Sequence, residues 1–114
     1  MYGMPKNFPF DKLEGAQVLQ ICYGENEVII NFTNEISILI MSRIKIEGDM
    51  ILNIETFKEN CIYINEFIGK IITSSSWLSE GIRISFGDRS IIIIDDSEEF
   101  ESFIISISQC RYVI

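Results

Sequence analysis

The residues best suited to chemistry form one dense run of carboxylates near the end of the chain. Within the segment DDSEEFE they are Asp95, Asp96, Glu98, Glu99 and Glu101. Closely spaced carboxylates can hold a hard divalent cation, form an acid–base pair, or meet Arg and Lys side chains of another protein. They can also be a solvated corner between two strands, because carboxylates are usually exposed.

The rest of the sequence argues against the metal and the acid–base pair. The run lacks the Gly and the DxDxDG spacing of an EF-hand loop. The chain contains no His, which removes the commonest general base and the commonest zinc ligand. The triplet Ser74–Ser76 stands in no GxSxG motif, and no phosphate-binding Gly-rich loop occurs. We therefore expect no enzymatic activity, no metal and no cofactor, and a partner-binding surface or a solvated corner remains.

Charge narrows the class of partner. The chain has 114 residues, of which 47% are hydrophobic, and a net charge of −8. This charge repels nucleic acid and anionic lipid and attracts basic surfaces, although it also serves solubility alone. The apolar runs are too short to span a bilayer, and the start MYGMPKNFPF does not resemble a secretory signal. These features predict a cytoplasmic protein with no nucleic-acid and no membrane partner.

Cys22, Cys61 and Cys110 form no CxxC pair, which favours buried free thiols.

The acidic run connects segments that read as strands. Apolar residues alternate with polar ones over 82–86, and a turn at 87–89 leads to the β-branched run 90–94. Alternation resumes over 103–107. This pattern predicts a three-stranded meander in which the carboxylates occupy the last connection.

A similar pattern lies 54 positions upstream. Gly15 precedes Gly69 by 69 − 15 = 54 residues, and Phe32 precedes Phe86 by 86 − 32 = 54 residues. At this offset Ile36, Ile38 and Ile40 match Ser90, Ile92 and Ile94. The ungapped match predicts an internal duplication with units 13–47 and 67–107. Two copies are too few for a solenoid.

The segment between the units has a helical period. Its apolar residues are spaced 3, 4, 3 and 4 apart, after a suitable N-cap at Asn53 and before Gly69: Ile54, Phe57, Cys61, Ile64 and Ile68. The tetrapeptide CIYI inside it is strand-like, which weakens the helix prediction. We expect one α+β domain over residues 1–114, mostly antiparallel β, with two duplicated β-meander units joined by one helix.

The second half also carries a resemblance. Phe86-Gly87-Asp88 and Phe100-Glu101-Ser102 stand within 68–105, which resembles small bacterial domains with the pattern "iG…l.l.F.dG..l.i…yES..i". Arg89 replaces the usual Gly after Asp. Some of these domains resemble immunity proteins of bacterial toxin systems, including contact-dependent growth inhibition. The resemblance implies a protein that binds and neutralises a cognate toxin domain, often a nuclease.

Three functions follow from these observations. The first is an immunity-type inhibitor of a basic toxin domain, with Asp95, Asp96, Glu98, Glu99 and Glu101 as the contact. The second is a structural β protein that forms a homodimer through a sheet edge. The third is an enzyme that uses carboxylates, with or without a cation.

Overall fold

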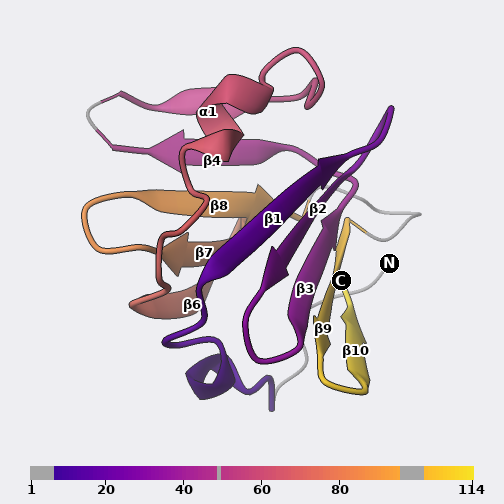
Figure 1. Ribbon diagram of the computed structural model, residues 1–114, viewed down its shortest axis with the longest axis vertical. Helices are drawn as coiled ribbons and strands as arrows, with labels where there is room; N and C mark the ends of the chain where they lie inside the picture. Colours follow the sequence, from indigo (N-terminus) through magenta and orange to yellow (C-terminus); the bar gives the residue numbers. More distant parts are fainter. Residues whose placement is uncertain (1–6, 49, 96–101) are drawn as a thin grey trace.

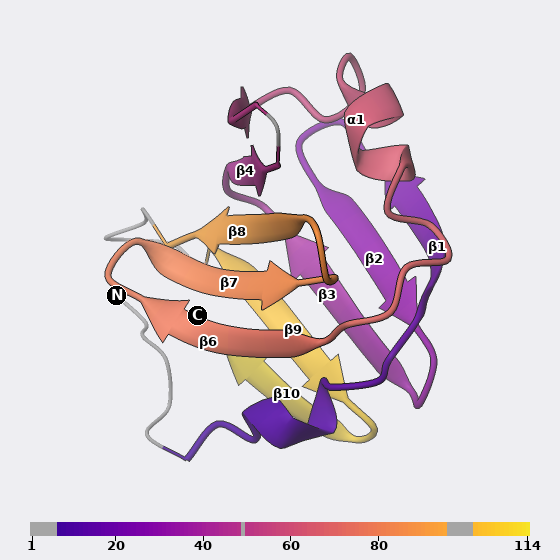
Figure 2. The same cartoon turned by 90° about the vertical axis from the view of Figure 1, so that its left-hand side faces the viewer.

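Alternating apolar residues build two antiparallel sheets of five strands each, packed across a shared core (Figures 1 and 2). The computed structural model describes residues 7–48, 50–95 and 102–114. In the first sheet the strands lie in the order β1 (Val18–Tyr23), β2 (Val28–Phe32), β3 (Ile36–Ile40), β9 (Phe103–Ile107) and β10 (Cys110–Val113). In the second sheet the order is β5 (Leu52–Ile54), β4 (Ile44–Glu47), β8 (Ser90–Ile94), β7 (Gly81–Ser85) and β6 (Ser74–Leu78).

The core consists of the inward-facing side chains of both sheets. Strands β2 and β3 each alternate buried and half-buried residues along their whole length, as a period of two requires. Ile38 of the first sheet and Ile84 of the second are both 0% exposed. Each such burial contributes about 1.5–3 kcal/mol, so the core residues hold the two sheets together.

Each half of the chain contributes strands to both sheets. After β3 the chain crosses to the second sheet, where the hairpin β4–β5 pairs with β8. After β8 it crosses back, and the hairpin β9–β10 pairs with β3. The predicted meander of 82–86, 90–94 and 103–107 is therefore wrong in its last strand, because β9 lies in the other sheet from β7 and β8 (Figure 2).

The two halves meet along a short antiparallel contact. Gln17 forms an isolated bridge with Ile71, and these positions differ by 71 − 17 = 54. Around it the backbone hydrogen bonds come in matching pairs: Gly15 N to Ile72 O and Gly69 N to Val18 O, both 2.8 Å. Gly15 and Gly69 both have positive φ, at 86° and 90°, so the two matched glycines have the same left-handed conformation.

The strand register shows that the ungapped match between the two halves is wrong by one residue after the hairpin turn. Three residues, 33–35, separate the paired Phe32 and Ile36, but only two separate Phe86 from Arg89, whose carbonyl accepts the Phe86 N–H. Strand β8 therefore matches β3 at an offset of 53. Ile91 and Ile93, rather than Ile92 and Ile94, belong to the common core beside Ile38 and Ile40.

The helix predicted between the units is mostly absent. Residues 52–54 form β5 instead, because they complete the edge of β4, and the helix α1 covers only Cys61–Asn65. Its N-cap is Asn60, with no side-chain capping bond. Ile68 is 48% exposed, so the apolar spacing does not correspond to one buried helical face. A short 3₁₀ helix, η1 (Phe10–Lys12), precedes Gly15.

The strands predicted over 82–86, 90–94 and 103–107 are confirmed within one residue as β7, β8 and β9. Residues 70–72 pair with 16–18 across the junction of the halves, and β6 begins only at Ser74. Among the described residues, no helix has the length and apolar character needed to cross a membrane.

Gly81 provides a test of the packing between β7 and β8. A Cβ at this position would lie 1.9 Å from the carbonyl oxygen of Ile93. We expect Gly81→Ala to destabilise the fold by about 3 kcal/mol or more, since buried backbone cannot move aside cheaply. The measurement is chemical denaturation of wild type and variant.

Gly87→Ala is the matched control. Gly87 has φ 92°, but nothing lies within 4 Å of its Cβ position, so only conformational strain of about 1–2 kcal/mol is expected. Equal losses in the two variants would contradict the assigned contact between β7 and β8.

Candidate functional site

The acidic segment leaves the second sheet at Asp95. This half-buried residue follows β8, and its backbone N–H donates to the Glu80 carbonyl at 2.8 Å. Its Oδ1 accepts a hydrogen bond from Ser102 Oγ at 3.3 Å. Asp95 and Ser102 therefore join the two ends of the segment 96–101, and Asp95 has a structural role as well as a charge. The other predicted contact residues lie outside the described part of the chain: Asp96, Glu98, Glu99 and Glu101.

Ser102 fixes the end of the acidic segment to the first sheet. It is 1% exposed and is the one buried polar residue among positions 7–48, 50–95 and 102–114. Its carbonyl accepts the Met41 N–H at 2.9 Å. In parallel, the Arg43 carbonyl accepts the Ile94 N–H at 3.0 Å. Backbone hydrogen bonds thus join the two ends of the first crossing, Met41 and Arg43, to the two residues Ser102 and Ile94 that flank 95–101.

A depression lies beside Met41, where the first crossing begins. Its volume is about 400 Å³, it is open to solvent, and its lining residues are Glu25, Asn26, Glu27 and Met41. Glu25 and Asn26 are exposed in the turn between β1 and β2, which the Gly24 N–H closes by donating to the Glu27 carbonyl at 2.8 Å. None of the four lining residues is basic, so the depression suits a cationic side chain of a partner.

Glu25 and Glu27 carry no signal of a site in the sequence, because Gly24–Glu27 has the pattern of a turn alone. The link between this turn and Ser102 depends on Met41, which lines the depression and shares a backbone hydrogen bond with Ser102, far away in the sequence. No local pattern encodes that contact.

Other candidate sites receive no support within the described ranges. No group of three His, Cys, Asp or Glu residues is placed to hold a metal there. Ser74–Ser76 belong to β6 and pair with β7. The enclosed cavity between the sheets measures only about 10 Å³ and has a wholly apolar lining, which leaves no room for a ligand. Trp77 is partly buried and packs against the core, as expected.

The three cysteines are free, as predicted, but they are not buried. Cys22 and Cys61 are half-buried and Cys110 is exposed. Cys22 lies on the outward face of β1, since the next residue, Tyr23, packs against the core.

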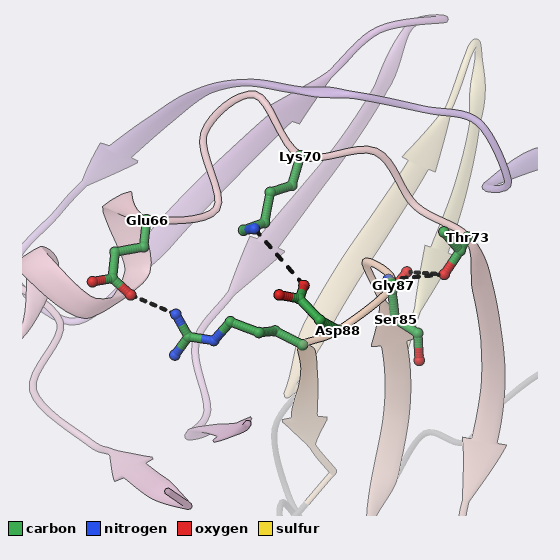
Figure 3. A network of polar contacts seen from close by, with 7 residues as sticks. Glu66, Lys70, Thr73, Ser85, Gly87 and Asp88 are labelled. Carbon is green, nitrogen blue, oxygen red and sulfur yellow. Dashed lines mark hydrogen bonds and ion pairs between the residues drawn. The ribbon is translucent and has the colours of Figure 1, made fainter. Parts of the chain in front are cut away.

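A polar network joins the β7–β8 turn to α1 and the segment after it, as Figure 3 shows. Glu66 pairs with Arg89, and Lys70 approaches Asp88 at 4.0 Å. Thr73 Oγ1 donates to the Ser85 carbonyl and accepts the Gly87 N–H, both at 3.1 Å. These groups contact one another, so we interpret the network as structural.

Arg89 is the central residue of this network. Its guanidinium lies 5.3 Å from the centre of the Phe67 ring, and its side chain is only 24% exposed. In the corrected register Arg89 matches Ile36, which faces the core. The residue that departs from the resembled pattern therefore fastens the turn to α1.

Tyr23 connects β1 to α1. Its hydroxyl lies within hydrogen-bond distance of the Cys61 carbonyl, at 3.2 Å, and of Asn65 Oδ1. Burial, and to a smaller extent the negative charge of a Cys61 thiolate, raise the pKa of Tyr23 from 10.0 to about 12. The phenol therefore stays protonated and can act as a donor at neutral pH.

Comparison with known proteins gives no family for the chain. No protein-family model matches it, and neither the curated proteins nor the solved structures include a significant match.

The raised pKa of Tyr23 has a measurable consequence. The unfolded chain loses this proton near pH 10 and the folded chain near 12, so the contribution to stability is complete below pH 10 and is lost as the pH rises to about 12. We expect the melting temperature of the wild type to fall more steeply over this interval than that of Tyr23→Phe. Tyr63→Phe, at a 41% exposed position, should keep the wild-type slope. Identical slopes in all three proteins would contradict the assignment.

Proposed function

We propose that the chain is an immunity-type protein that binds a basic toxin domain and neutralises it. The observation that carries the proposal is a depression lined by Glu25, Glu27 and Met41, and the Met41 N–H donates to the carbonyl of Ser102, the residue that follows the acidic run in the sequence. Carboxylates grouped in this way attract Arg and Lys side chains and accelerate encounter with a basic surface. The net charge of −8 acts in the same direction.

The resemblance of 68–105 to small bacterial domains, some of which resemble immunity proteins, supports the same function. An immunity protein needs a rigid binding surface rather than catalytic residues. The charge of that surface has to complement the charge of the target. A nuclease domain is a suitable target, because it binds nucleic acid through basic residues that an acidic inhibitor can cover.

A second candidate is self-association. Leu19 and Ile71 lie beside the bridge that joins the halves, and they are 56% and 51% exposed. Exposed apolar side chains near a sheet edge favour pairing with another copy. Sedimentation over a wide concentration range separates the two functions, since only self-association requires a dimer of the isolated chain.

We also propose that the two halves descend from one five-stranded unit. Support comes from the same strand order in both sheets and from the matching contacts of Gly15 and Gly69. In this account each unit gives its last hairpin to the other sheet, so neither unit forms a complete sheet alone.

The inhibitor function can be tested by charge reversal in the acidic segment. The variant changes Asp96, Glu98, Glu99 and Glu101 to Lys and keeps Asp95, whose hydrogen bond to Ser102 would otherwise be lost. Tagged protein is used to isolate partners from the native host at low and at high salt. We expect one basic partner, bound at least tenfold more weakly by the variant and more weakly at high salt, because the contact is electrostatic.

The matched control reverses four exposed carboxylates elsewhere, Asp11, Glu14, Glu55 and Glu59. It has the same net charge as the variant but should retain affinity within about threefold, since only long-range attraction changes. Recovery of the bait alone argues against an inhibitor. Equal weakening in both variants argues against this placement of the contact.

A further inference from the structure

The outward face of the first sheet carries a row of apolar side chains that crosses all its strands. The members are cross-strand neighbours in register: Cys22, Ile29, Leu39, Ile104 and Val113. Successive side chains of a strand point to opposite faces, and Ile30, Ile38 and Ile105 belong to the core. The row therefore points away from the second sheet.

The second sheet has a row at the matching positions, and its composition is different. The members, again cross-strand neighbours, are Ser76, Arg83, Ile92, Lys45 and Asn53. Ile92 is 0% exposed because the aliphatic stems of Arg83 and Lys45 flank it. An outward apolar row is thus not needed to form a sheet of this order.

The charged groups of this second face also satisfy one another. Arg83 contacts Glu47 at 3.1 Å, and Lys45 approaches Glu80 at 3.7 Å. On the first sheet, by contrast, the neighbours of Leu39 are Ile29 and Ile104, so no polar stem covers it from the adjacent strands. Ile104 in this row is 7% exposed and the other four residues are half-buried, so the row is partly accessible to solvent. A contiguous apolar row that stays partly accessible is typical of an interaction surface.

Polar groups border the apolar row on both sides. Two residues further along each strand, on the same face, lies a polar row: Gln20, Asn31, Ser37, Ser106 and Arg111. On the opposite side, Glu27 and Met41 lie two residues beyond Ile29 and Leu39 on the same face, and both line the depression of about 400 Å³. The apolar row and the carboxylate-lined depression are therefore continuous.

We propose that this face, the apolar row together with the depression, is the docking surface for a basic protein partner. The proposal rests on the proposed function and identifies the face that the partner covers. An apolar strip of the partner would lie against Leu39, and its Lys or Arg side chains would enter the depression beside Glu25 and Glu27. A second copy of the chain fits less well, because it also carries a net charge of −8 and like charges repel.

Site-specific photo-crosslinking in the native host tests this surface. The photoreactive residue p-benzoylphenylalanine replaces Ile29 in one variant and the matching Arg83 in the other. We expect the Ile29 variant to form one adduct, identified by mass spectrometry as a protein of net positive charge. The Arg83 variant should give at least tenfold less adduct. Adding Glu25→Lys and Glu27→Lys to the Ile29 variant should lower the yield at least fivefold.

The outcomes separate this surface from the function on which it rests. A basic adduct at Arg83 but not at Ile29 would overturn the surface and leave the inhibitor function standing. No adduct at either position would also overturn the surface, and the inhibitor function then falls only if the isolation of partners described above recovers the bait alone. An adduct of twice the mass of the chain, or one with an acidic protein, would also overturn the inference, as would a yield unaffected by the Glu25 and Glu27 changes. Each variant must have the melting temperature of the wild-type protein. If the Ile29 variant does not, the photoreactive residue is placed at Leu39 instead.

Discussion

The fold depends on the exchange of hairpins between two sheets that neither half of the chain can complete alone. The first half contributes β1–β3 to one sheet and β4–β5 to the other, and the second half does the reverse. Each half forms a three-stranded meander. The edge of that meander at β3 or β8 is covered by the hairpin that the other half contributes. Because each sheet needs both halves, the burial of core Ile residues such as Ile38 and Ile84 couples the entire chain into one unit.

The exchange also explains where the candidate surface lies. Each half must cross once between the sheets, and backbone hydrogen bonds from Met41 to Ser102 and from Ile94 to Arg43 hold the two crossings together. The second crossing contains the acidic segment, and the first begins at Met41, which lines the depression. The carboxylates of Glu25 and Glu27 thus lie beside Met41, at the place where the backbone leaves regular strand pairing.

The local part of this structure could be predicted from the sequence. A period of two is a local signal, and it identified most strands and the turns that join them. The helix over 54–68 was wrong because the same apolar spacing also fits an edge strand, a turn and one short helix, and only pairing with β4 decides between them. The exchange of hairpins left no local signal, since a strand that returns to its neighbour and one that crosses to the opposite sheet have the same alternation.

The candidate site was predictable to the same extent. The run 95–101 is visible as composition, but the hydrogen bond of Asp95 to Ser102 that gives one of its carboxylates a structural role is not. The outward apolar row was hidden for a different reason. Ile29 and Ile30 are adjacent and equally apolar, and only the register shows that Ile30 faces the core and Ile29 faces away from it.

The outward apolar row is informative because the two sheets have the same strand order and can be compared position by position. In most proteins an outward Ile or Leu on a sheet needs no explanation, since β-branched and apolar residues favour strands on either face. Here the same strand order occurs twice in one chain, and Arg83 and Lys45 stand where the first sheet has Ile29 and Ile104. Both versions form a five-stranded sheet against the same core, so strand propensity and core packing do not account for the difference between the outward faces. The difference supports the proposal that the outward face of the first sheet is the one that meets a partner.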